Sequence, residues 1–391
     1  MHEIMQEGYR QEHRLLCESL DRFLTAQYSF DQRRKMLAAD KGFNREIWRS
    51  FGDLGLLALP FESRYGGLEA DGISTLIVMQ AFGRALVLEP YVPCIVLSGE
   101  LLSQGAGEEL KCELIPKIIT GETVCATAFA EAGSRYNLAN VAVTAQRRSR
   151  GYVINGRKAV VFGAPFADRL FITARTAGGL YDRAGITVFA LSAAADGMTR
   201  RDYTTVDGMA ASEVEFRDVV VAENAVVGTV DAGFDLIEGA VDVATAAVCA
   251  EAVGIMGALF ARTQEHVRSR IAFGKRLSEF QVIRHRLVDM RLAFEYASAI
   301  SLRAAEDSRG AGSRRAMSVS AAKALVGREM GSVGKAAVQL HGAMGLTDEL
   351  DVGHFFKRLT TIQMSFGNVD YHLRRLAWFH ARGQDELEVA R

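Results

Sequence analysis

The spacing of apolar residues changes twice along the chain, and this change constrains the fold more than any other feature. Helical spacing is expected over 15–24, 47–57, 73–86, 95–102 and 111–119. A spacing of two replaces it over 123–129, 141–146, 152–161, 169–174, 185–191 and 212–221. Long Ala-rich amphipathic stretches follow over 231–268, 278–308, 313–340 and 365–382. The sequence therefore predicts an α+β fold with an N-terminal helical domain (1–121), a middle antiparallel β domain (122–229) and a C-terminal four-helix bundle (230–391).

The middle domain is predicted to be a barrel or sandwich. No helix-length pattern alternates with its strands, which argues against a βαβ sheet. Asn155-Gly156 is typical of a two-residue hairpin turn, and we expect one there. Gly105-Ala106-Gly107 lacks a third glycine and a preceding strand, so it does not indicate a dinucleotide-binding Rossmann domain.

Composition argues against several functions. The net charge is −1, which gives no field that would attract nucleic acid or an anionic membrane. None of the five cysteines lies in a CxxC or Cys/His cluster, so no metal site is expected. Asp242 and Glu251 interrupt the best apolar run, and no apolar leader opens the chain, so we expect no membrane segment and a cytoplasmic protein.

The stretch 270–281 (RIAFGKRLSEFQ) is the most informative segment of the C-terminal half. A helix is expected to lead to Arg270, a turn to lie at Phe273-Gly274-Lys275, and a second helix to begin at Phe280-Gln281. Such an elbow directs a guanidinium and a carboxamide to the same side, which suits a diphosphate and a ribose. An ordinary αα-hairpin with surface charges is the alternative.

Five motifs in order resemble those of the acyl-CoA dehydrogenase family, and the resemblance covers nearly the whole chain. They are Leu57-Ala58-Leu59-Pro60 with Tyr65-Gly66-Gly67; Ala128 to Ser134, in the place of the family's flavin loop; Phe216-Arg217-Asp218-Val219; Arg270-x-x-Phe273-Gly274 with Phe280-Gln281; and Gln339-Leu340-His341-Gly342-Ala343-Met344-Gly345.

This resemblance implies FAD, a homo- or heterotetramer, and α,β-dehydrogenation of an acyl-CoA thioester. It implies that electrons leave to an electron-transfer flavoprotein or to oxygen. Carried over residue by residue, the cofactor-binding positions are Arg270, Phe273, Gln281, Gln339, Leu340, His341, Gly342, Ala343, Phe129, Glu131, Ser134, Val160, Phe162 and Asn368. For His341, a purely structural role is the alternative.

The sequence departs from the family at the flavin ring and at the catalytic base. Most members carry a Glu before a Gly-Thr near the last helix, and Phe366 matches it here. A minority carry the Glu on the long bundle helix, at a place that matches Ala244. The Trp-x-Thr that covers the flavin matches Val160 and Phe162.

Two carboxylates are candidates for a relocated base. Asp370 follows Phe366 by about one helical turn, with a role in stabilising the first turn of the helix as the alternative. Glu251 lies on the helix face of Ala244 in apolar surroundings, where a lone carboxylate is costly. An ion pair with an arginine of a neighbouring helix is the alternative.

Three functional interpretations remain open. The chain uses a relocated base; or it is a catalytically silent partner that completes the FAD site of a sister subunit; or it is a non-redox binding protein on the same fold. The segment 344–368 most resembles the partner (small) subunits of heteromeric enzymes such as pimeloyl-CoA dehydrogenase. This resemblance implies lipid metabolism, including steroid degradation.

Overall fold

The computed structural model describes residues 10–39, 42–149, 151–310 and 312–389, with side chains up to residue 381. The described residues form two compact units. The helical unit comprises the described parts of Met1–Arg33, Asp71–Val87 and Thr245–Arg391. The β-sheet unit comprises those of Arg34–Ala70 and Leu88–Ala244. The first 121 residues are divided between these two units. The boundaries of the three expected domains stay a prediction.

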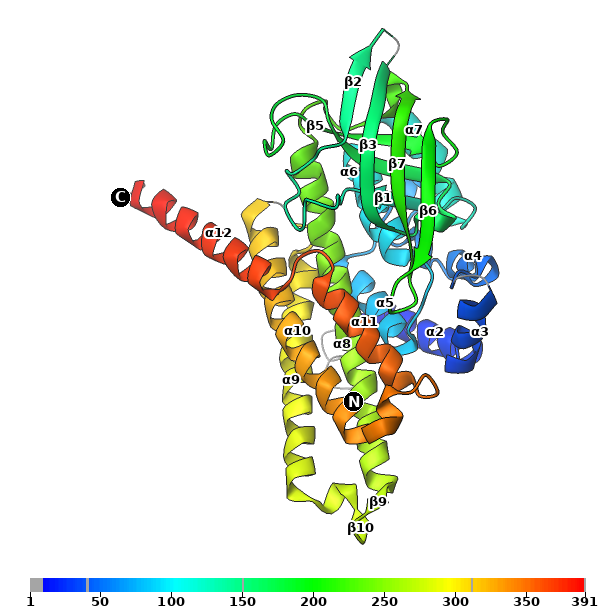
Figure 1. The fold of residues 1–391 in the computed structure, drawn as a ribbon, viewed down its shortest axis with the longest axis vertical. Helices are drawn as coiled ribbons and strands as arrows, with labels where there is room; N and C mark the ends of the chain where they lie inside the picture. Colours follow the sequence, from blue (N-terminus) through cyan, green and yellow to red (C-terminus); the bar gives the residue numbers. More distant parts are fainter. Residues whose placement is uncertain (1–9, 40–41, 150, 311, 390–391) are drawn as a thin grey trace. The chain divides into compact units, whose positions relative to one another are not determined.

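Long helices that pack along their length form the helical unit. Its elements are α2 (Gln11–Gln27), α5 (Gly72–Ala85), α9 (Gln281–Asp307), α10 (Gly312–His341), α11 (Asp351–Met364), α12 (Val369–Val389) and the part of α8 (Gly233–Ser269) from Thr245 onward. Helices α9 and α10 run antiparallel side by side, joined by a short turn (Figure 1). This packing brings the beginning of α9 and the end of α10 toward one end of the unit.

Helix α8 contains an 18-residue window that is apolar on all sides. It is 37 residues long, and by length and composition alone it could cross a membrane, but 94% of its most apolar window is buried inside the protein. A helix that is hydrophobic all round is typical of a core position. Burial by its neighbours therefore accounts for its composition.

One main sheet organises the β-sheet unit. Its strands are β1 (Cys125–Ala128), β2 (Thr144–Arg148), β3 (Gly151–Phe162), β4 (Arg169–Arg175), β5 (Ile186–Ser192), β6 (Met198–Thr204), β7 (Ala210–Val221) and β8 (Val226–Val227). The strand order is β6-β7-β3-β2-β4-β5-β8, and β1 pairs with β4. Most pairs are antiparallel as expected, but β1 runs parallel to β4, and β2 meets β4 in parallel at Thr144 and Arg175.

Short helices accompany this sheet within the same unit. They are α4 (Arg45–Asp53), a π-helix (Val92–Ser98), α6 (Gly99–Gly105) and α7 (Glu108–Ile119). The core of the sheet is built from inward residues of β3, β4, β5 and β7, including Ile154, Ile172, Phe189 and Phe216. In β3 and β7 buried residues alternate in part with more exposed ones, which explains the spacing of two there. Strands β4 and β5 are buried at nearly every residue.

The hairpin turn expected at Asn155-Gly156 is wrong. Both residues lie inside β3, which pairs with β2 from Gly151, opposite Arg148, to Asn155, opposite Thr144. The pairing of β3 with β7 shifts register between Ile154 and Gly156. The Asn155 side chain accepts from the Asp218 backbone N–H at 2.8 Å, so this Asn-Gly pair marks a bulge and not a loop.

Periodicity did not reveal α3 (Phe30–Ala39), α11, β6 or β8. Helix α11 buries Val352, Phe355, Leu359 and Ile362, a regular helical stripe inside a segment interpreted only by its motifs. Strand β6 has no buried residue and lies at the sheet edge. Its charged side chains are typical of edge strands and hide the alternation.

Candidate functional site

The elbow of 270–281 forms at the end of α8, with a small hairpin between the two helices. Strands β9 (Ile271–Ala272) and β10 (Lys275–Arg276) pair around Phe273 and Gly274, whose φ angles are 55° and 81°. Helix α9 then begins at Gln281. The expected helix–turn–helix geometry is confirmed, and the positive φ of Gly274 explains a glycine there.

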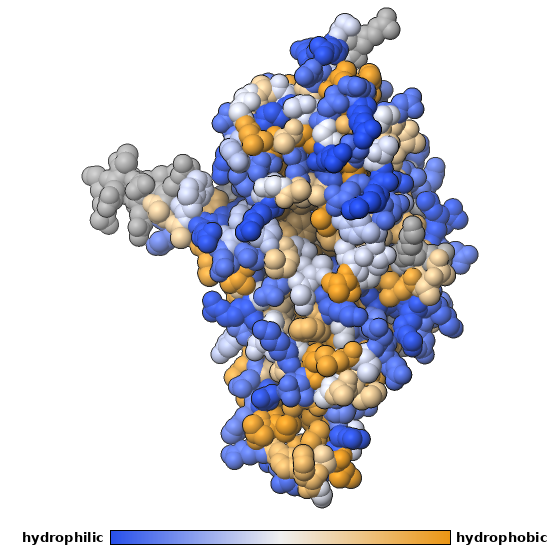
Figure 2. Space-filling model, in the orientation of Figure 1, coloured by the Kyte–Doolittle hydropathy of each residue, from blue (hydrophilic) through white to orange (hydrophobic). Residues whose placement is uncertain are grey.

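The elbow presents its polar groups to solvent. Arg270 and Gln281 are exposed, and within the described part of the chain the Arg270 guanidinium has no hydrogen-bond or ion-pair partner. Phe273 is 93% exposed at the tip. Figure 2 shows apolar residues gathered at this end of the helical unit. A free cation beside an exposed aromatic ring is suited to an anionic, aromatic ligand.

The segment from Gln339 to Ala343 closes α10 and lies at the same end. Gln339, Gly342 and Ala343 are exposed, whereas the Leu340 and His341 side chains are buried. Gly342 has φ 63°, and no atom lies within 4 Å of the place where a Cβ would stand. This glycine therefore leaves its backbone open to a ligand, while Leu340 contributes to packing.

His341 connects this segment to the elbow. Its ring stacks on that of His266, in the last turn of α8, with centroids 4.4 Å apart and planes at 26°. Its Nδ1–H donates to the Ala337 carbonyl at 2.8 Å. Both alternatives for His341 thus have support: the ring is held structurally, and it lies beside the open glycine.

In the β-sheet unit, Glu131 does not offer its carboxylate to a ligand. Oε1 accepts from Lys158 Nζ at 2.7 Å, and the two oxygens also accept from the Ala142 and Val143 backbone N–H groups. Lys158 also donates to Thr173 Oγ1 at 2.9 Å. Burial lowers the pKa of Lys158 to about 8, although the nearby Glu131 carboxylate acts in the opposite direction and raises it. Glu131 therefore acts on the predicted flavin loop by fixing its backbone.

The other predicted flavin-side residues offer little hydrogen bonding. The Ser134 hydroxyl donates to the Glu131 carbonyl at 2.9 Å and accepts from the Glu131 N–H at 3.0 Å, so it closes its own turn. Val160 is 45% exposed, with φ 52° at a second register shift of β3. Phe129 and Phe162 are half-buried. This surface is apolar where the family's pattern is polar.

Glu251 is bound in an ion pair with Arg358 of α11. Arg358 Nε lies 2.5 Å from Glu251 Oε1, and its second nitrogen lies 2.7 Å from Oε2. Both side chains are buried or nearly so. The alternative given for Glu251 is thus what the structure shows, and this two-point pair leaves the carboxylate unsuited to proton abstraction.

The Phe366–Asn368 turn, in which Phe366 matches the family's base, is held in place by buried groups outside it. Lys323 Nζ donates to the carbonyls of Gly367 at 2.6 Å and Gln363 at 3.3 Å. The His372 ring N–H donates to the Phe366 carbonyl at 3.0 Å. Burial lowers the pKa of Lys323 to about 8 and that of His372 to about 3. The turn keeps a fixed backbone although its side chain cannot take a proton.

Asn368 and Asp370 continue from this turn into α12. The Asn368 side-chain oxygen accepts from the Tyr371 N–H at 3.0 Å, so it caps the helix. Asp370 is exposed in the first turn of α12. A base for this chemistry needs a dry setting, which Asp370 lacks in the single chain. We therefore assign neither carboxylate as the base.

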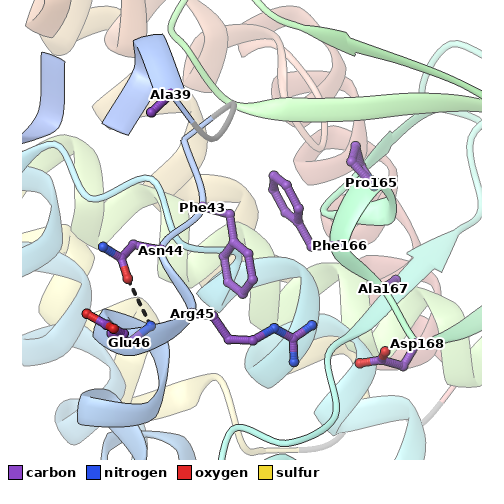
Figure 3. Close-up of a pocket in the computed structure, with 9 residues that line it drawn as sticks. All are labelled: Ala39, Phe43, Asn44, Arg45, Glu46, Pro165, Phe166, Ala167 and Asp168. Carbon is purple, nitrogen blue, oxygen red and sulfur yellow. Dashed lines mark hydrogen bonds between the residues drawn. The ribbon is translucent and has the colours of Figure 1, made fainter. Parts of the chain in front are cut away.

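A separate pocket of about 870 Å³ opens in the β-sheet unit, lined by none of the predicted site residues. Figure 3 shows Phe43 and Phe166 side by side, with Arg45 reaching past Phe43 toward Asp168. The two rings stack with centroids 4.6 Å apart. Because one guanidinium and two carboxylates (Glu46, Asp168) share this pocket, its charge selects no ligand class.

The sequence did not point to Lys158, Lys323, Arg358 or His266. Lys158 and Lys323 each occupy a buried position within an apolar strand or helix, and that break in the pattern is the signal that could have found them. No group of three or more His, Cys, Asp or Glu side chains in the described ranges is arranged to hold a metal ion.

Comparisons with known proteins match all three parts of the chain. Profiles described as acyl-CoA dehydrogenase N-terminal, middle and C-terminal domains match residues 10–122, 126–219 and 231–379. The L-prolyl-[peptidyl-carrier protein] dehydrogenase of Serratia sp. (strain ATCC 39006) is 24% identical over 88% of this chain and 87% of that protein. The caffeyl-CoA reductase-Etf complex subunit CarC of Acetobacterium woodii is 28% identical over 81% and 84%. The structure of the FAD complex of PigA superposes with a TM-score of 0.86 at 22% identity, over 95% of this chain and 97% of that one.

Proposed function

The chain belongs to the acyl-CoA dehydrogenase family, and we propose that it takes part in FAD-dependent α,β-dehydrogenation of an acyl thioester as one subunit of a heterotetramer. In this proposal the chain supplies the elbow that completes a cofactor site, and a sister subunit supplies the base. The acyl group is carried by CoA or by a carrier protein, as the names of two relatives suggest. A cytoplasmic location belongs to the same proposal.

The observation that supports this most is the contrast between the two halves of the expected site. The elbow and the Gly342 turn are exposed, unoccupied by side-chain partners and built for an anion. The flavin-side residues are apolar or engaged in their own turns, and the buried carboxylate Glu251 is paired with Arg358. The residues proposed to bind the diphosphate are present, whereas the carboxylate proposed for proton removal is absent at Phe366.

FAD supplies the two-electron acceptor of this reaction. Arg270 and the backbone at Gly342 neutralise and approach its diphosphate, and the Gln281 and Gln339 amides are available for its hydroxyl groups. Removal of the proton next to the thioester needs a carboxylate. Phe366 cannot act as one, and Glu251 is occupied by Arg358.

The outward face of α9 supports association with other subunits. Val288, Leu292 and Tyr296 are exposed and four residues apart, so they form one apolar stripe along the helix. Such stripes on soluble proteins mark contact surfaces. We infer that this stripe belongs to an interface of the tetramer.

The Arg270→Ala substitution tests the elbow. We expect FAD affinity to fall by about 10- to 100-fold, because a charge-assisted hydrogen bond contributes about 1.5–3 kcal/mol. Fluorescence titration of the apoprotein or apo-complex with FAD measures it. Arg268→Ala, an exposed arginine two residues earlier, is the matched control and should leave affinity unchanged. If Arg270→Ala bound FAD as tightly as Arg268→Ala, the elbow would be an ordinary αα-hairpin.

The visible spectrum tests the heteromer. We expect the chain purified alone to carry little FAD, and the complex with its sister acyl-CoA dehydrogenase subunit to carry half occupancy. Turnover is then assayed with acyl-CoA and acyl-carrier thioesters. Full FAD occupancy and turnover by the chain alone would show a self-sufficient enzyme. Colourless protein in both preparations would favour the non-redox interpretation.

A further inference from the structure

Two stacked imidazoles lie directly beneath the exposed end of the helical unit. His266 belongs to the last turn of α8, and His341 is the last residue of α10. Their rings are 4.4 Å apart. The Nδ1–H of His341 donates to the Ala337 carbonyl, which fixes the ring against which His266 stacks.

The pair is joined on both sides to the groups that face solvent. The Arg270 backbone N–H donates to the His266 carbonyl at 2.8 Å, so one turn of helix separates the ring from the free guanidinium. Gly342, with its open backbone, follows His341 directly. Each of the two groups that would bind an anion therefore lies close along the chain to one of the two rings: Arg270 is one turn after His266, and Gly342 directly follows His341.

The surroundings of His266 favour its neutral form. Burial, then His341, then Arg270 lower the pKa of His266. Arg262, one turn before His266, is paired with Asp351 of α11 and adds no free charge. Both rings lie at helix C-termini, where the helix dipole favours a cation. A proton on His266 is thus opposed first by burial, and then by the neighbouring ring and by Arg270.

We propose that His266, stacked on His341, is a proton-linked part of the anion-binding end, so that binding of a diphosphate brings a proton onto His266. The anion neutralises Arg270 and adds negative charge beside the rings, and each change favours imidazolium. The ligand class is a diphosphate with or without a nucleoside. This inference rests on the proposed cofactor function for its biological ligand, but its chemistry does not require FAD.

The sign of the pH dependence follows from linkage. The pKa of His266 in the free protein is below its ordinary 6.5, and the bound anion raises it. Binding therefore takes up a proton at pH values between the two pKa values. Affinity for the anion rises as pH falls through this window, by up to about tenfold for each unit of pKa difference.

Calorimetric titration with inorganic pyrophosphate and with FAD, in buffers of different ionisation enthalpy at pH 6.5, counts the protons taken up. The full-length chain and its complex are both measured. We expect binding to take up a fraction of a proton more in wild type than in the double variant His266→Phe/His341→Phe, which keeps two stacked rings. The ionisation of pyrophosphate itself is common to both proteins. His285→Phe, an exposed histidine near the start of α9, is the control and should behave as wild type.

The outcomes separate the inference from the proposed function. Unchanged proton uptake in the double variant would overturn the inference even if FAD binds. Proton-linked binding of pyrophosphate without any binding of FAD would support it and refute the cofactor proposal. If the double variant does not fold, the single variant His266→Phe takes its place: the same proton uptake as in wild type overturns the inference.

Discussion

The Lys158→Met variant is expected to lose about 3–5 kcal/mol of unfolding free energy, because removing one partner leaves the other charge buried and unpaired. Glu131 would keep only its two backbone donors inside the β-sheet unit. Urea unfolding followed by circular dichroism measures the loss. The effect on function is indirect, because Glu131 holds the loop that ends at Ser134.

A neighbouring residue supplies the control for Lys158. Arg157→Met removes a cation one position earlier, but that side chain is 75% exposed in its pair with Glu215. We expect a change within about 0.5 kcal/mol there. The double variant Lys158→Met/Glu131→Gln should recover part of the loss. Equal stability of Lys158→Met and Arg157→Met would show that the buried pair does not hold the β-sheet unit together.

The Arg358→Met variant is expected to be destabilised by a similar amount, about 3–5 kcal/mol, since Glu251 would remain as a buried, unpaired carboxylate on α8. Glu251→Gln should lose stability for the converse reason. Thermal unfolding and turnover of the complex are measured together. The combined variant Glu251→Leu/Arg358→Met should be more stable than Arg358→Met alone, because neither charge is then buried.

The same pair of measurements distinguishes a structural carboxylate from a catalytic one. Lys357→Met, next to Arg358 on α11, removes an exposed cation whose partner Asp348 is also exposed, and it should change little. If Glu251→Gln kept full stability but abolished turnover, Glu251 would be the base, and our assignment of it to the fold would be wrong.

The fold was predictable wherever apolar spacing reports burial on one side. The three-part order of helices, strands and helices follows from it and is confirmed. Spacing fails where burial has no such pattern, as in β6 at the sheet edge. Local turn chemistry also failed at Asn155-Gly156, because Asp218, 63 residues away, binds the Asn155 side chain. A tertiary contact there overrides a strong local preference.

The predictability of the candidate site also depends on whether its residues contact sequence neighbours or distant residues. The elbow around Arg270 is made by neighbours in sequence, and its geometry was predictable. The fate of Glu131 and Glu251 depends on Lys158 and Arg358, which lie 27 and 107 residues away. A motif names the carboxylate but not its partner, so a cofactor role for Glu131 and a catalytic role for Glu251 could not be separated from ion pairs in advance.

The turn at Phe366 shows how such a protein can change its task through evolution. Lys323 and His372 hold its backbone through carbonyl oxygens, which every amino acid possesses. Selection for assembly can therefore preserve the frame while the side chain at this position drifts. The backbone of this turn is therefore held in the same way whichever residue stands at position 366.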